Sequence, residues 1–133
     1  MTSYILDTNI LSDLIDNPWG AAQKRLDRLN DVRICTSIIS AAELKYGAVR
    51  RQSIRLSHEV EEVLSRIEIV DFSPEADRHY AYIRYQLERS GTPISGNDML
   101  IAAHALALDC ILVTASIREF ARIEGLRVEN WLD

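Results

Sequence analysis

The chain has 133 residues, enough for one domain with a buried core and too few for two comfortable ones. Hydrophobic residues make up 47% and charged residues 26%, the balance of an ordinary globular protein. The net charge of −5 argues against a protein that coats nucleic acid through a basic surface. It does not argue against a nuclease, because a site built from carboxylates is acidic and bound metal reverses the local charge. We expect a single domain spanning residues 1–133.

No segment has the pattern of a targeting peptide or a membrane span. The N-terminus lacks basic residues before its apolar run, which Asp7 ends, so it does not read as a signal peptide. The apolar stretch 101–108 is interrupted by His104 and is much shorter than the roughly 18 residues that cross a bilayer. Cys35 and Cys110 lack the partners that zinc requires and are expected to be reduced cysteines in buried strands. A cytoplasmic protein with no membrane partner is predicted.

Short apolar runs rich in β-branched residues alternate with longer stretches of helical pattern. The predicted strands are 4–6, 32–36, 67–71, 110–114 and 127–130. The predicted helices are 37–49, 53–65, 73–91 and 97–108, and Ser73-Pro74-Glu75 has the residues typical of a helix start. This alternation predicts an α/β fold with a mainly parallel five-stranded sheet and right-handed crossovers.

Four acids that are far apart in the sequence fall at one edge of this predicted sheet. Asp7 follows the first strand, and Glu43 lies in the first turns after the second. Asp98 begins the helix that precedes the fourth strand and runs antiparallel to it, and Glu119 follows that strand by five residues. Ligands of open α/β sheets collect at the carboxyl ends of the strands. The four acids therefore predict a functional site.

Each acid also has a purely structural interpretation. Asp7-Thr8-Asn9 fits an Asx-turn that caps a short helix. The segments Ser40–Glu43 and Ser116–Glu119 both fit a capping box. Asp98, beside the expected N-cap Asn97, would be favoured by the helix dipole. For the four acids together a purely structural role is less favoured, because crowded like charges repel one another unless a cation neutralises them. Oxygen ligands without nitrogen or sulfur suit Mg²⁺ or Mn²⁺ rather than zinc.

Four segments are similar to the motifs of one enzyme family. They are YILDTNI at 4–10, SAAELKYGA at 40–48, GNDMLIAAHA at 96–105 and REFARIEGLRVENW at 118–131. In this order and at these intervals they resemble the PIN-domain nucleases, specifically the VapC-type toxins of bacterial toxin–antitoxin systems. The segments are spread over essentially the whole chain, and the four together are far more specific than any one alone.

The resemblance implies a three-layer α/β/α fold with Asp7 and Asp98 on Mg²⁺, which Mn²⁺ can replace, and Glu43 completing the acidic cluster. It also implies endonucleolytic cleavage of RNA, inhibition by a cognate antitoxin, and homodimerisation. The sequence departs from the family pattern at Thr114-Ala115-Ser116-Ile117, where a polar side chain is missing at position 115. Glu119 is the remaining candidate for the fourth position of the site.

The expected reaction is attack on an RNA phosphodiester by a metal-oriented water, which Glu43 positions or deprotonates unless it holds a second ion. Thr8 and Thr114 are candidates to hold the carboxylates or metal-bound water, although threonine is common at strand ends. The basic residues that follow Glu43 either contact RNA phosphates or form an exposed helix end; they are Lys45, Arg50, Arg51 and Arg55. His104 points away from Asp98 on an ideal helix and receives no catalytic role. Tyrosines 80, 82 and 85 favour core or dimer packing over base stacking.

Three other functions remain to be weighed. Ala115 and Ser116 leave open a PIN-like RNA- or protein-binding module that has lost activity. A receiver domain would use Asp71 as its phosphoacceptor, but the segment after the fifth predicted strand has no lysine. A phosphatase with Asp7 as nucleophile usually needs a second acid two residues on, where this chain has Asn9.

Overall fold

The structure is a computed structural model that describes residues 1–132. Within this range the strands are β1 (Thr2–Leu6), β2 (Val32–Ser37), β3 (Glu68–Val70), β4 (Ile111–Val113) and β5 (Val128–Glu129). The helices are α1 (Thr8–Asp16), α2 (Ala21–Arg28), α3 (Ile38–Arg51), α4 (Ile54–Ser65), α5 (Pro74–Arg89), α6 (Gly96–Ala107) and α7 (Ile117–Phe120).

The strands form one parallel sheet in the order β3-β2-β1-β4-β5. Leu6 at the end of β1 pairs with Thr36 in β2 and with Val113 in β4, so these three strands end at the same level. The chain first adds strands on one side of β1 and then crosses to the other side. The reversal between β1 and β4 is a topological switch point, where α/β sheets form their ligand crevice.

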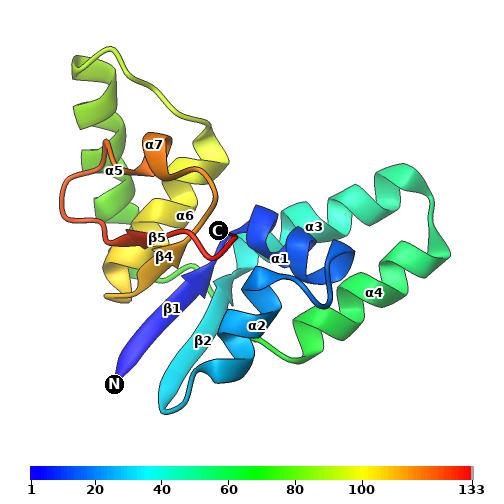
Figure 1. Cartoon of the computed structure of the whole chain (residues 1–133). Helices are drawn as coiled ribbons and strands as arrows, with labels where there is room; N and C mark the ends of the chain where they lie inside the picture. The colour runs from blue at the N-terminus through cyan, green and yellow to red at the C-terminus, as the bar shows by residue number, and fades with distance from the viewer. Residues whose placement is uncertain (133) are drawn as a thin grey trace.

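The direction of the crossovers decides which helices cover which face of the sheet. Helices α1 to α4 lie on one face, while α5, α6 and α7 lie on the other (Figure 1). Right-handed crossovers require this division, because the chain moves in opposite directions along the sheet before and after β3. The predicted three-layer α/β/α fold with a five-stranded parallel sheet is confirmed.

Alternate side chains of the central strands enter two separate cores. Leu6 and Val113 pack into the core under α1 to α4. Ile5 and Leu112 pack into the core under α5 and α6. All four are fully buried, and truncating such a residue to alanine costs about 2–5 kcal/mol. These cores keep the strand ends rigid, and the candidate site is built on those strand ends.

The structure differs from the sequence predictions in several local features. Helix α2 is missing from the predictions because its sequence is mostly polar and Ala22 is its one fully buried residue. Helix α6 begins at Gly96 and is capped by Ser95, so the expected N-cap Asn97 is wrong. Cys35 and Cys110 are buried free thiols, as expected, but Cys110 lies just before β4 rather than inside it.

The strand order also tests the interpretation of the chain as a receiver domain. A receiver domain places its third strand beside its first, in the order 2-1-3-4-5. Here β3 is an edge strand separated from β1 by β2, so Asp71 does not follow a strand that neighbours β1, and the receiver interpretation is wrong. Among the described residues no helix is both long and apolar enough to span a membrane.

Candidate active site

Asp7 occupies the switch point directly after β1. Its backbone N donates to the carbonyl oxygen of Val113 at 3.0 Å, which fixes the residue between β1 and β4. Its carboxylate caps α1 by accepting a hydrogen bond from the backbone N of Ile10 at 3.0 Å. The capping interpretation of Asp7 is therefore correct. It does not explain why the cap is an acid that is only 5% exposed, because a neutral asparagine or serine caps a helix equally well.

The environment of Asp7 favours its protonated form. Burial, followed by repulsion from Asp98, raises the pKa of Asp7 to about 6. A hydrogen bond from the Thr114 hydroxyl and one from the backbone N of Ile10 oppose that rise. A buried carboxyl group with a raised pKa beside a second carboxyl group is typical of functional sites rather than of helix caps.

Asp98 links the acids of the site electrostatically. It lies in the first turn of α6, where its backbone N donates to the Ser95 hydroxyl oxygen at 3.1 Å. Burial raises the pKa of Asp98, and the negative charges of Glu43 and Glu119 raise it further, against a hydrogen bond from Ser95. Since Asp98 also raises the pKa of Asp7, it interacts with each of the other three predicted acids.

Glu43 is held by two neutral donors from other helices. The Thr8 hydroxyl donates to Oε1 of Glu43 at 2.6 Å, and the Asn97 side-chain amide donates to Oε2 at 3.0 Å. The capping box predicted for Ser40–Glu43 is wrong, because Ser37 caps α3 and Ser40 lies inside the helix. Glu43 is consequently free of a local structural role and faces α1 and α6.

Glu119 and Thr114 complete the edge of the site on the β4 side. Thr114 accepts a hydrogen bond from the backbone N of Ser116 at 2.9 Å and donates to Asp7. Of the two threonines, Thr8 donates to Glu43, as predicted for a residue that holds a carboxylate, and Thr114 lowers the pKa of Asp7. Ser116 makes no side-chain cap to α7, so the second capping box is also wrong. Glu119 is partly buried within electrostatic range of Asp98, while Ala115 is exposed.

The donor set suits a hard divalent cation bound by few protein ligands. Within residues 1–132, no three Asp, Glu, His or Cys side chains stand close enough together to hold an ion among them. Mg²⁺ commonly takes only one or two carboxylates and keeps several of its waters. Asp7 and Asp98 fit this requirement, because they are adjacent, oxygen-bearing and mutually repulsive.

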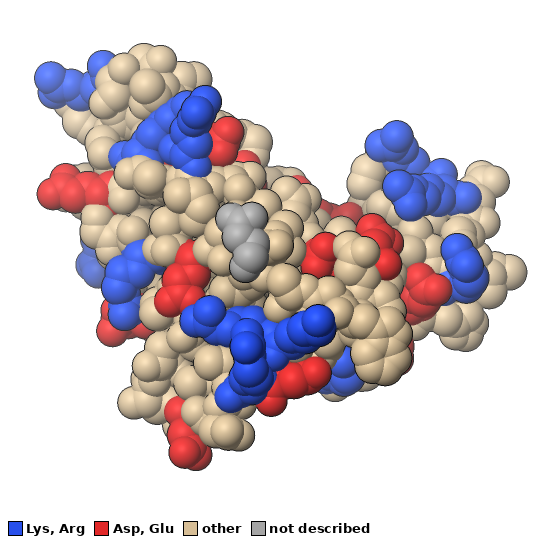
Figure 2. All heavy atoms as spheres, in the orientation of Figure 1, with Lys and Arg blue, Asp and Glu red and all other residues tan. Residues whose placement is uncertain are grey.

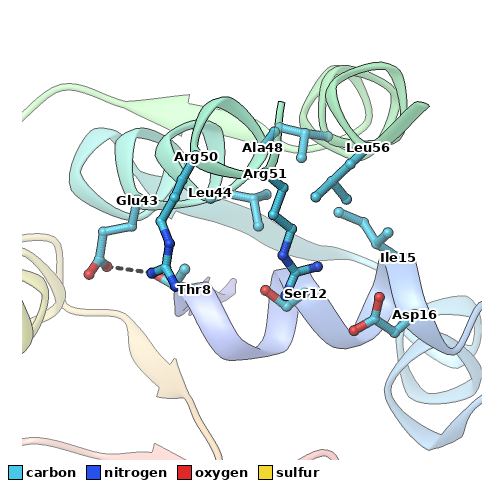
Figure 3. Close-up of a pocket in the computed structure, with 12 residues that line it drawn as sticks. Thr8, Ser12, Ile15, Asp16, Glu43, Leu44, Ala48, Arg50, Arg51 and Leu56 are labelled. Atoms are coloured by element: carbon cyan, nitrogen blue, oxygen red, sulfur yellow. Dashed lines mark hydrogen bonds between the residues drawn. The ribbon is translucent and has the colours of Figure 1, made fainter. Parts of the chain in front are cut away.

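A pocket of about 280 Å³ opens beside the site, between α1 and the α3–α4 pair. Thr8 and Glu43 line one part of it, and the side chains of Arg50 and Arg51 extend from α3 toward α1 (Figure 3). The remaining lining residues are Ser12, Ile15, Asp16, Leu44, Gly47, Ala48, Leu56 and Val60. The two arginines therefore lie over a pocket that has Glu43 toward one end and Asp16 toward the other (Figure 3).

The four basic residues after Glu43 are all exposed but are not equivalent. Figure 2 shows basic side chains gathered where α3 meets α4, the upper right of the molecule in Figure 1. Lys45 is paired with Glu61 at 3.6 Å and Arg55 with Glu59 at 3.8 Å. Within residues 1–132, no ion pair involves Arg50 or Arg51. These two arginines are the cations available to an anionic ligand in the pocket.

Other predicted residues lie away from the acids. His104 is fully buried, with Nδ1 2.9 Å from the Ser37 hydroxyl, and burial lowers its pKa. It has no contact with the site, as expected. Tyr82 and Tyr85 are 71% and 59% exposed, so core packing is wrong for both. Asn97 is the site residue that the sequence predictions missed, since they treated it only as a cap.

A family model for the PIN domain matches residues 4–126. The chain therefore belongs to the PIN domain family. Among curated proteins, the tRNA(fMet)-specific endonuclease VapC of Salmonella typhimurium is 39% identical over 132 residues, covering 98% of this chain and 99% of that protein. Ribonuclease VapC2 of Haemophilus influenzae is 38% identical over 133 residues, covering 99% and 100% of the two chains.

Solved structures give the same result. VapBC2 from Rickettsia felis, bound to a DNA fragment from its promoter, aligns with a TM-score of 0.93 at 38% identity, covering 98% of this chain and 99% of that chain. VapBC-1 from nontypeable Haemophilus influenzae aligns with a TM-score of 0.90 at 33% identity, covering 99% and 100%. The similarity to VapC-type PIN proteins extends over the full chain, as the sequence motifs predicted.

Proposed function

We propose that this protein is a Mg²⁺-dependent endoribonuclease and the toxin of a toxin–antitoxin pair. The observation that carries the proposal is the convergence of Asp7, Glu43 and Asp98 at the switch point from three different helix starts and strand ends. The full-length similarity to proteins named as ribonucleases and endonucleases supports the choice of RNA as substrate.

Asp7 and Asp98 are the residues that would hold the cation. When bound, the cation orients a water, lowers its pKa and offsets the charge that develops on a phosphoryl oxygen. The Thr114 hydroxyl favours the ionised form of the Asp7 carboxylate, the form that binds a cation. The backbone N of Ile10 donates to the same carboxylate from the α1 side, so Asp7 is held by its surroundings before substrate arrives.

Glu43 is the residue positioned to accept the proton of the attacking water. Each of its carboxylate oxygens accepts one hydrogen bond, from Thr8 or from Asn97, and each retains a lone pair. A lone pair that faces Asp98 is able to accept the proton that water loses on attack. Glu119, whose charge raises the pKa of Asp98, adds negative charge to the site and is the candidate for the fourth position.

Arg50 and Arg51 are proposed to bind RNA phosphates on the path to the acids. Both line the pocket that Thr8 and Glu43 also line, and no ion pair within the described part of the chain occupies them. Arginine binds phosphate oxygens through paired N–H groups, and such contacts position a nucleic acid strand without reading its bases. An acidic protein can thus bind RNA locally, through a small basic surface beside its site.

A cognate antitoxin and a second copy of this chain are the proposed protein partners. The similar structures from Rickettsia felis and Haemophilus influenzae are titled as VapBC proteins. Size-exclusion chromatography with light scattering, on the chain alone and co-expressed with the product of its neighbouring reading frame, tests both partners. A monomeric chain that captures no small protein contradicts this part of the proposal.

The second candidate function is an inactive PIN-like binding module, which the exposed Ala115 favours because it offers no polar group at that position. The test uses metal-free protein and RNA, with Mg²⁺ or Mn²⁺ then added. Since the relative from Salmonella typhimurium is named for tRNA(fMet), initiator tRNA is the first RNA to try, beside ribosomal and messenger RNA. Metal-dependent cleavage supports the nuclease. Binding without cleavage at any metal concentration supports the module.

A further inference from the structure

We propose that Thr8 and Asn97 are positioning residues whose role is to hold the Glu43 carboxylate close to Asp98. The inference rests on the proposed nuclease function and deepens it. The three residues come from the starts of α1, α3 and α6, and they are separated in sequence by 35 and 54 residues. They connect the helices on opposite faces of the sheet at the edge where the acids lie.

Both oxygens of the Glu43 carboxylate accept hydrogen bonds. Thr8 donates to Oε1 at 2.6 Å and Asn97 donates to Oε2 at 3.0 Å. Glu43 is only partly buried and has three rotatable side-chain bonds, so the two hydrogen bonds restrict a side chain that packing leaves partly exposed. Repulsion from Asp98 would otherwise favour rotamers that carry the carboxylate out into solvent.

The chemistry of the two donors matches this role. A lysine or arginine would also hold Glu43 near Asp98, but its charge would cancel the negative charge that attracts a cation. The hydroxyl of Thr8 and the amide of Asn97 are neutral, so they orient the carboxylate and leave its charge in place. The site thus gathers negative charge without neutralising it internally.

Asn97 has no competing structural role that accounts for its side chain. Ser95, not Asn97, caps α6 by accepting the backbone N–H of Asp98 at 3.1 Å. The Asn97 side chain is exposed and belongs to neither hydrophobic core. Its hydrogen bond to Glu43 is therefore the contact that distinguishes asparagine from other polar residues here.

The kinetic test compares Thr8→Val, Thr8→Ser and Asn97→Ala with Asn30→Ala. Asn30 is an exposed asparagine before β2, at the opposite edge of the sheet. We expect Thr8→Val and Asn97→Ala each to lower kcat about 5- to 10-fold, the size of one typical protein hydrogen bond at a partly exposed site, with KM changed less than about twofold. Thr8→Ser keeps the hydroxyl, so its kcat should equal that of wild type. Asn30→Ala should also leave kcat unchanged. Unchanged kcat in Asn97→Ala overturns the inference.

A double-mutant cycle with Glu43→Ala separates positioning from a general effect on the fold. If Asn97 acts through Glu43, adding Asn97→Ala to Glu43→Ala lowers kcat less than about twofold further. An equal loss in both backgrounds contradicts the inference, because Asn97 would then act on something other than Glu43.

A readout without RNA keeps this inference distinct from the proposed function. The side-chain amide resonance of Asn97 in an NMR spectrum of the metal-free protein should shift in Glu43→Ala and remain in place in Asn30→Ala. If the wild-type protein cleaves no RNA but the resonance shifts, the nuclease proposal fails while the contact stands. If the resonance does not respond to Glu43→Ala, Asn97 does not hold Glu43 and the inference fails, whatever the activity.

Discussion

Removing the charge of Asp7 should stabilise the metal-free protein while it abolishes cleavage. Asp7 is 5% exposed, and its pKa of about 6 lies well above the ordinary value of 3.8. The folded state therefore binds the proton more tightly than the unfolded state does. Stability from this group is fully present below the unfolded pKa and is lost as the pH rises through about 6. Asp7→Asn has no such titration.

The magnitude follows from the difference in pKa. A rise of about two units corresponds to about 3 kcal/mol, at about 1.4 kcal/mol per unit. Asparagine retains an oxygen that accepts the backbone N–H of Ile10, so the α1 cap survives. Relative to wild type, Asp7→Asn should thus gain roughly 2–3 kcal/mol of stability between about pH 4.5 and pH 8.

Urea unfolding of both proteins in EDTA, at several pH values, measures this difference directly. The gap in unfolding free energy should widen in favour of Asp7→Asn as the pH rises and should level off above about pH 7. Added Mg²⁺ should stabilise wild type more than the variant, since it binds the ionised carboxylate. A gap that does not change with pH, or that narrows as the pH rises, would refute the raised pKa of the buried Asp7 carboxyl group.

Other variants test the roles of Asp98, of the two pocket arginines and of His104. Asp98→Asn should abolish Mg²⁺-dependent cleavage and lower the pKa of Asp7, because it removes the repulsion between the two; a pH titration of Asp7 by NMR checks the direction. Arg50→Ala and Arg51→Ala should each raise KM about 3- to 10-fold, leave kcat unchanged and flatten the salt dependence of KM, whereas the exposed Arg28→Ala should do none of these. His104 is buried with a lowered pKa, so its contribution to stability is present above about pH 6.5 and is lost as the pH falls. Urea unfolding of His104→Asn should lack that acid-side loss even though the variant is weaker at neutral pH.

The position of the acids could be predicted from sequence because strand ends are well marked in an α/β chain. The apolar run that ends at Leu6 places Asp7 at the sheet edge, and the mostly apolar helix after Gly96 places Asp98 there as well. Both positions depend only on local pattern and on the general rule for parallel sheets. Register between strands, such as Leu6 opposite Thr36, could not be read from the sequence.

The sequence predictions of helix caps are wrong where two local patterns compete for the same helix start. Ser40 and Glu43 fit a capping box, but β2 extends to Ser37, which caps α3 first and leaves Ser40 inside the helix. The same competition between Ser95 and Asn97 moved the start of α6. Only the tertiary structure reveals that Glu43 and Asn97 meet, because 54 residues separate them and no local motif joins them.

The most direct test of the central claim is RNA cleavage by the purified, metal-free protein on addition of Mg²⁺, with Asp98→Asn prepared in parallel. Wild type should cut RNA internally only when Mg²⁺ or Mn²⁺ is present, whereas Asp98→Asn should fold, bind RNA and not cut it. Cleavage by wild type that persists in EDTA, or full activity in Asp98→Asn, would contradict the central claim.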